Sequence, residues 1–80
     1  MERSREKEIP VAPITRILRK EGAERVSDEA AVYLRDFIEE VARYIAKEAV
    51  SLARHSNRKT VTRRDVEYVA KKIHSRLYVF

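Results

Sequence analysis

The chain has 80 residues, of which 39% are charged, and a formal net charge of +5 at pH 7. A chain of this length forms one domain at most and lies near the lower limit for a stable hydrophobic core. The lack of cysteine excludes disulfides and thiolate chemistry, and no apolar run is long enough to span a bilayer. We therefore expect an intracellular protein with an anionic partner.

Residues 1–8 form a polar leader that is not a signal peptide and that we expect to be frayed. A short helix should follow, with Pro13 in its first turn. Its apolar stripe consists of Ile14, Ile17 and Leu18. The basic residues outside this stripe are Arg16, Arg19 and Lys20. Gly22 then stands where a left-handed helix cap is needed.

The longest predicted element runs from Ser27 to His55 without a glycine or a proline. Ser27 is a favourable N-cap, and the next two residues are acidic, which suits the helix dipole. At ~1.5 Å per residue this helix is roughly 40 Å long, whereas a compact domain of this size is only about 30 Å across. The helix therefore extends beyond any globule that its own chain could form around it.

The apolar face of this long helix is also too wide for a surface helix. It covers roughly 260° at ~100° per residue, against about 100° for an ordinary amphipathic helix. Arg35, Glu39 and Glu48 interrupt it. Since two short flanking segments cannot cover such a face, we expect an obligate dimer. The residues assigned to the dimer core are Leu34, Phe37, Ile38, Val41 and Ile45.

A third helix is predicted after a second loop. Asn57 can replace glycine in a left-handed cap, and Thr62 with Asp65 suggests a capping box at the start of the third helix. The apolar stripe of that helix is Val66, Val69, Ala70, Ile73 and Leu77. The predicted fold class is all-α, in the order short helix, loop, long helix, loop, short helix.

This order, together with particular residues, resembles the histone fold and specifically the archaeal histones. The resemblance covers about residues 9–75 and is carried by IPVAPITRILRKEGAERVS and LARHSNRKTVTRRDVEYVAKKI. It implies a handshake homodimer in which the long helices cross and the first loop of one chain lies beside the second loop of its partner. The histone-fold domain would span residues 9–76, followed by an apolar extension at 77–80.

The positive charge lies mainly in the flanking helices and loops, while the long helix is slightly acidic. Charge alone fits a merely solvated surface equally well, but the resemblance implies DNA binding. Arg25 would enter the minor groove, where arginine responds to groove width rather than base identity. The phosphate contacts would be made by Arg16, Arg19, Lys59 and Thr60. Arg58 would instead form a structural ion pair with Asp65.

The resemblance further places Leu52, His55 and Asp65 in a contact between dimers, crossed by a His–Asp hydrogen bond. Tetramers or longer stacks on DNA are therefore expected. A lone histidine at such a place is otherwise usually packed or hydrogen-bonded. Tyr68 lies close to this contact, where a smaller aliphatic residue is usual in the family.

We therefore predict an architectural protein that dimerises, binds duplex DNA largely without sequence specificity, bends and wraps it, and compacts the chromosome in the cytoplasmic nucleoid. The partner chain would be a second copy or a paralogous histone. The alternative is a heterodimerising subunit of a transcription or DNA-repair complex. No enzyme is expected, because the sequence has no glycine-rich phosphate loop and no HExxH motif. No cofactor, metal, membrane or small-molecule substrate is expected either.

Overall fold

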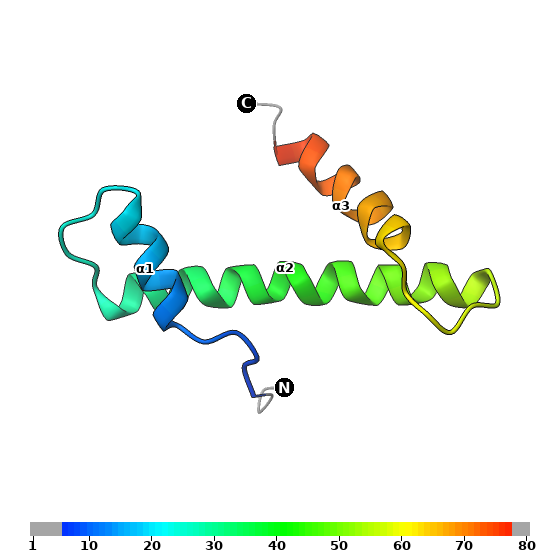
Figure 1. Ribbon diagram of the computed structural model, residues 1–80, viewed down its shortest axis with the longest axis horizontal. Coiled ribbons are helices and arrows are strands. Elements are labelled where there is room, and N and C mark those ends of the chain that lie inside the picture. The colour runs from blue at the N-terminus through cyan, green and yellow to red at the C-terminus, as the bar shows by residue number, and fades with distance from the viewer. Residues whose placement is uncertain (1–5, 78–80) are drawn as a thin grey trace. The chain divides into compact units, whose positions relative to one another are not determined.

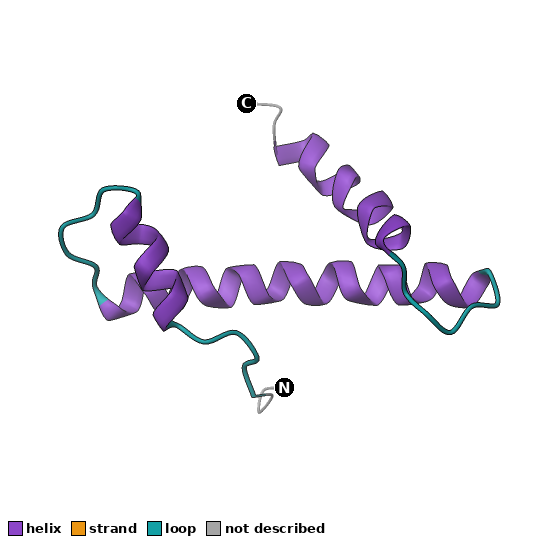
Figure 2. Cartoon of the chain, in the orientation of Figure 1, coloured by secondary structure: helices purple, strands orange, loops and turns teal. Residues whose placement is uncertain are grey.

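The computed structural model describes residues 6–77, with side chains described for residues 6–74. It contains three helices: α1 (Ala12–Lys20), α2 (Asp28–His55) and α3 (Arg63–Leu77) (Figure 1). Within the described range the chain is otherwise loop, without a strand (Figure 2). The predicted all-α order of short, long and short helix is confirmed. Residues 1–5 and 78–80, most of the predicted leader and C-terminal extension, lie outside the described residues.

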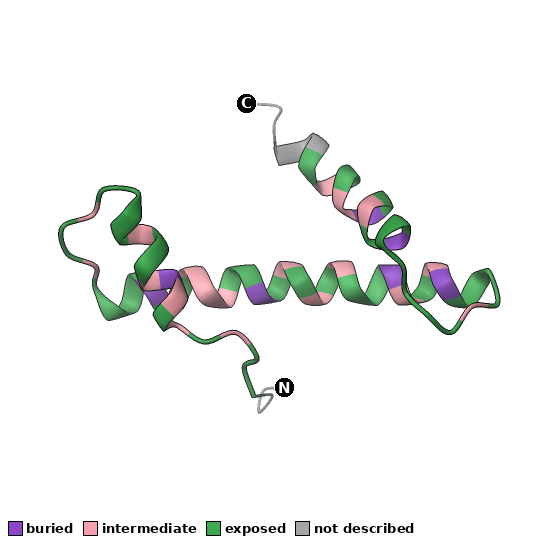
Figure 3. Cartoon of the chain, viewed as in Figure 1, coloured by how far each residue is buried: buried purple, intermediate pink, exposed green. Residues whose placement is uncertain are grey.

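The chain divides within α2 into two compact units, the first ending at Val41 and the second beginning at Ala42. In the first unit Ile14 of α1 and Ala31 of α2 are buried. The second unit buries residues of α2 and α3, coloured purple in Figure 3: Ala49, Ala53 and Val69. These residues are small or medium in size, and among the described side chains no large one is fully buried. Each unit therefore has only a thin core of its own.

The predicted dimer-core residues of α2 lie at the edge of these cores or outside them. Phe37 is 52% exposed and Ile38 is 38% exposed. Three further members are only half-buried: Leu34, Val41 and Ile45. Tyr33 and Tyr44 of the same helix are more exposed still. A single chain therefore leaves much of its apolar surface uncovered.

The C-terminal ends of α1 and α2 are built in the same way. Gly22 has φ 117° and Asn57 has φ 57°, so each places a left-handed residue just beyond its helix. The N–H of the following residue then donates to a carbonyl five positions back, at 3.2 Å after α1 and 2.9 Å after α2. The left-handed cap predicted at both positions is confirmed, and the structure adds the hydrogen bonds that close it. It fixes the point at which each loop leaves its helix.

The N-termini of α2 and α3 are capped differently from each other. At α2 the Ala30 N–H donates to the Ser27 hydroxyl at 3.1 Å, as predicted. At α3 the Thr62 N–H donates to the Asp65 carboxylate at 2.8 Å, which is one half of the predicted capping box. The other half was wrong: the Thr62 hydroxyl donates to the same carboxylate, and the Asp65 N–H donates to the Thr62 carbonyl. A hydroxyl can donate or accept, and donation to an anion is the stronger bond.

Candidate nucleic-acid interface

The first loop presents Arg25 between two fixed points. The cap at Gly22 ends α1, and Ser27 begins α2, so the loop between them is short. The Arg25 side chain is exposed. Arg25 thus lies in a short loop between two capped helix ends and is exposed, so an anionic partner can reach it.

Helix α1 carries the next two candidate cations. Ile14 is buried and Leu18 half-buried on one side of this helix, while Arg16 and Arg19 are exposed. Arg19 also lies in the last turn, where a cation is stabilised by the helix dipole. That effect gives Arg19 a structural reason to be basic, whereas Arg16, in the middle of the helix, has no such reason.

The second loop separates one inward arginine from two exposed residues. Lys59 and Thr60 are exposed, and Arg58 is half-buried. The Arg58 guanidinium donates to both oxygens of Asp65, at 2.8 Å each, and to the Thr60 carbonyl at 3.2 Å. Arg58 therefore holds the backbone from which Lys59 projects. The contact with the Thr60 carbonyl was not foreseen from the sequence.

Asp65 is the fixed point of this loop. Its residue is only 3% exposed, and its carboxylate accepts bonds from Arg58 and from the N–H and hydroxyl of Thr62. The hydrogen bonds from Arg58, and then that from the Thr62 backbone, hold the pKa of Asp65 far below its usual range, against the opposing effect of burial. The same hydrogen bond raises the pKa of Arg58. The pair is therefore fully ionised across the physiological range.

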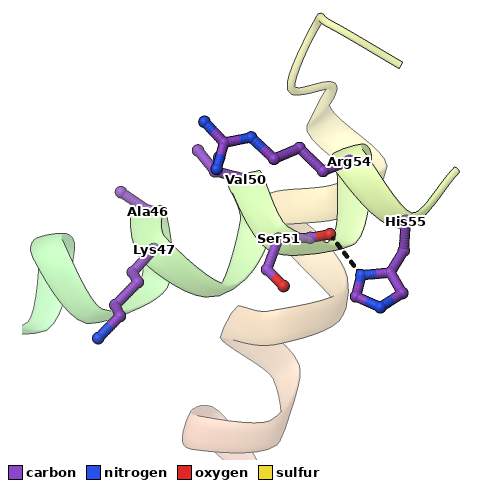
Figure 4. A pocket seen from close by; sticks show the side chains of 6 residues that line it. All are labelled: Ala46, Lys47, Val50, Ser51, Arg54 and His55. Carbon is purple, nitrogen blue, oxygen red and sulfur yellow. Dashed lines mark hydrogen bonds between the residues drawn. The ribbon is translucent and has the colours of Figure 1, made fainter. Parts of the chain in front are cut away.

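The last turns of α2 hold the residues assigned to a contact between dimers. Leu52 is half-buried and His55 is exposed. The His55 ring folds back along the helix, with Nδ1 3.1 Å from the Ser51 carbonyl oxygen (Figure 4). Because a carbonyl only accepts, Nδ1 carries the proton in this bond. His55 thus keeps Nε2 for an outside partner.

An open groove of about 550 Å³ lies along this part of α2, beside the His55 ring. The residues that line it are Ala46, Lys47, Val50, Ser51, Arg54 and His55 (Figure 4). The lining includes the basic side chains of Lys47 and Arg54 and the His55 imidazole, and it contains no acidic residue. On α3, Tyr68 is 57% exposed, with the Lys72 ammonium 4.7 Å from its ring centre. Both surfaces are accessible in the single chain.

The candidate DNA-binding residues are divided between the two units. Arg16, Arg19 and Arg25 belong to the first, and Lys59 with Thr60 belongs to the second. Within the described residues there is no group of three or more acidic or histidine side chains that could hold a metal ion. None of the described helices is long and apolar enough to cross a membrane.

Comparisons with known proteins identify the family that the chain resembles over most of its length. The family model described as "Histone-like transcription factor (CBF/NF-Y) and archaeal histone" matches residues 7–69. An archaeal histone of Thermococcus zilligii, one of the HAN1 chains, is 50% identical over 64 residues, covering 80% of this chain and 96% of that protein. "Probable archaeal histone 3" of Methanocaldococcus jannaschii is 52% identical over 60 residues, covering 75% and 90%. "Histone H4" of Tetrahymena thermophila is 38% identical over 71 residues, covering 84% and 65%.

Proposed function

The chain belongs to the family of histone-like transcription factors and archaeal histones, and we propose that it is an architectural protein that binds duplex DNA, bends and wraps it, and compacts the chromosome. One observation carries this proposal: the exposed, candidate DNA-binding cations lie in α1 and in both loops, all inside the matched segment. Loops and helix ends are the elements that proteins commonly use to contact phosphates.

The DNA-binding unit would be a handshake dimer of two copies, or of one copy and a paralogous histone. Its core would be formed by the five residues of α2 that a single chain leaves exposed or half-buried: Leu34, Phe37, Ile38, Val41 and Ile45. Burying a large apolar side chain completely contributes about 1.5–3 kcal/mol. The single chain already covers about half of each of these side chains, so each of the ten in a dimer would contribute part of this amount, and their sum would supply the driving force that the thin cores of the two units lack.

DNA would be held through its backbone and its shape. Lys59, Thr60, Arg16 and Arg19 would contact phosphates, and Arg25 would enter the minor groove. Phosphate neutralisation releases condensed counterions, so binding would depend steeply on salt and little on sequence. Minor-groove arginines favour narrow, easily bent DNA without reading individual bases. This combination suits a protein that wraps DNA of any sequence.

Dimers would then join through Leu52, His55 and Asp65 into tetramers or longer stacks. Oδ1 of Asp65 accepts one bond from Arg58, which leaves it one further lone pair for a histidine of a neighbouring dimer. Since Nδ1 of His55 is bonded to Ser51, that histidine would donate from Nε2. The ion pair and the contact between dimers are therefore compatible in hydrogen-bonding terms.

The heterodimerising subunit of a transcription or repair complex is the less favoured function, because the two archaeal relatives above are named as histones. Family membership likewise favours a structural, chromosome-associated protein over an enzyme. We place it in the nucleoid. Purification of the chain alone separates the two functions. A stable homodimer supports the architectural protein, and an insoluble chain that needs a different partner supports the alternative.

The proposal is tested by gel shift and nuclease footprinting on random-sequence DNA at several salt concentrations. We expect binding that weakens steeply with salt, and a regular ladder of protected lengths that grows as dimers are added. Absence of a shift at low salt would refute DNA binding. Footprints that never exceed the length bound by a single dimer would refute the stacking, while leaving the binding intact.

A further inference from the structure

A segment just before α1 is bound along α2 by polar side chains. The Glu8 N–H and the Ile9 N–H both donate to Oε1 of Glu39, at 2.9 Å each. The Arg35 guanidinium donates to the Ile9 carbonyl at 2.8 Å. The sequence had placed residues 1–8 in a frayed leader, which is wrong for Glu8. The interruptions of the apolar band at Arg35 and Glu39 are explained by this bound segment.

Glu39 is suited to hold a backbone segment firmly. It is 3% exposed, although it is a carboxylate on an otherwise largely apolar face. A buried carboxylate is stable only when it is hydrogen-bonded, and bonds from N–H groups to an anion are stronger than neutral ones. Two successive N–H groups directed at one anion form a compact anion-binding arrangement. These two N–H groups belong to the N-terminal segment, and the anion that they bind is the Glu39 carboxylate of α2.

Arg35 completes the attachment from the other side. Its side chain is 14% exposed, and its Nε donates to Asp36 at 2.7 Å, which orients the guanidinium toward Ile9. Lys7 lies 3.7 Å from the same aspartate, but both side chains are more than 40% exposed. Exposed pairs of this kind contribute little. The attachment therefore depends mainly on Glu39 and Arg35, and we call these two residues with residues 7–9 the N-terminal latch.

The latch is joined to α1 by a stiff connection. Only Pro10 separates Ile9 from Val11, the N-cap residue of α1. Proline fixes its own φ and restricts the residue before it to extended conformations. The Val11 carbonyl accepts the N–H groups of Ile14 and Thr15 at 2.9 and 3.1 Å. The position of Ile9 thus determines where α1 begins.

We propose that Glu39 and Arg35 are positioning residues for DNA binding, which fix the start of α1 and so hold Arg16 and Arg19 in place for phosphate contact. The DNA step rests on the proposed function, whereas the latch itself does not. Loss of the latch would leave α1 less ordered before binding, and DNA would then have to order it. We expect this to weaken DNA binding by roughly 3- to 10-fold.

The latch is tested without DNA by amide hydrogen exchange of the full chain, followed by NMR. The amides of Glu8 and Ile9 lie outside the helices, so slow exchange there in the wild type would report their bonds to Glu39. Glu39→Gln should speed exchange at both amides, and Glu40→Gln, an exposed neighbour with the same charge change, should not. If Glu39→Gln fails to fold, Arg35→Ala should still speed exchange at residues 7–9. Unprotected amides in the wild type, or unchanged exchange in the variants, would overturn the latch.

The positioning role is tested by DNA affinity in two backgrounds. Glu39→Gln and Glu40→Gln each remove one negative charge, so electrostatics alone would strengthen DNA binding equally. We expect Glu39→Gln to bind roughly 3- to 10-fold more weakly than Glu40→Gln in the wild-type background. In the Arg16→Ala/Arg19→Ala background the two variants should bind equally, because the positioned groups are gone.

An equal deficit of Glu39→Gln in both backgrounds would overturn the positioning role and indicate a general loss of structure. No deficit in either background would also overturn it. If the wild type does not bind DNA, the proposed function and the positioning role fail together. The exchange measurement, which uses no DNA, would still decide whether the latch exists.

Discussion

The salt dependence of DNA binding can be derived from which cations are available. Arg16, Arg19, Arg25 and Lys59 are exposed, whereas Lys7, Arg35 and Arg63 each pair with an acidic side chain. Arg58 is excluded from this set because both of its terminal nitrogens are bonded to Asp65. Four cations per chain give about eight per dimer. At a slope of about −0.9 per neutralised phosphate, log K should fall with log salt with a slope of roughly −7.

Arg25→Ala removes two of these eight cations from a dimer. The slope should then fall to roughly −5, so that doubling the salt weakens the variant by roughly 40-fold and the wild type by roughly 100-fold. The loss should be the same on all sequences, since a minor-groove arginine carries little base information. Fluorescence anisotropy with several unrelated duplexes of equal length, at four or more salt concentrations, measures both quantities.

The matched control is Lys47→Ala, which removes the same charge from an exposed position within α2. Its slope should stay closer to that of the wild type than the slope of Arg25→Ala. Equal slopes for Arg25→Ala and the wild type would show that Arg25 neutralises no phosphate. A strong preference of the wild type for one short motif would refute backbone binding altogether.

Three other variants test the structure beneath this surface. Gly22→Ala should destabilise the protein by about 1–2 kcal/mol in urea unfolding, because φ is 117° while no atom lies within 4 Å of the added Cβ, so the cost is conformational alone. Phe37→Ala should raise the dissociation constant of a homodimer, measured by sedimentation, by roughly 100-fold. About half of each Phe37 side chain is exposed in the single chain, so burying both in a dimer would contribute about 2–3 kcal/mol, which the variant loses. An unchanged dimer would place Phe37 outside the interface. Asp65→Asn should flatten the acid dependence of Tm: the pKa of Asp65 is lowered on folding, so its stabilisation is complete above the unfolded value of about 4 and is lost as pH falls below it. A wild type and variant with parallel Tm curves between pH 7 and pH 2 would contradict this.

Much of the fold was predictable because its signals are local. Gly22 and Asn57 each adopt the left-handed conformation expected of them, and Ser27 caps α2 through its own hydroxyl. Each of these outcomes depends on a few neighbouring residues and on steric limits that the sequence expresses directly. The ends of α1 and α2 and the start of α2 follow from these local signals.

The parts that the sequence did not predict depend on distant partners. Glu39 stood out as a charge within an apolar band, but its partners are backbone groups 30 and 31 positions away. Backbone N–H groups are present at every residue except proline, so no pattern of side chains points to those two. The predicted direction of the Thr62 hydroxyl's hydrogen bond was wrong for a different reason. Its direction depends on a carboxylate whose position is fixed by Arg58.

Glu39 and Asp65 are the only charged residues buried within the described part of the chain. Each accepts bonds from backbone N–H groups, and each thereby fixes a segment next to candidate DNA contacts, one before α1 and one before α3. The cations themselves remain exposed. Net charge alone predicts that neutralising either acid strengthens DNA binding, since the protein becomes more positive. The geometry predicts the opposite sign for both, because each substitution releases a segment that holds cations in place. Weaker binding by Glu39→Gln and Asp65→Asn, beside stronger binding by Glu40→Gln, would show that in this basic protein the buried acids position the cations that bind.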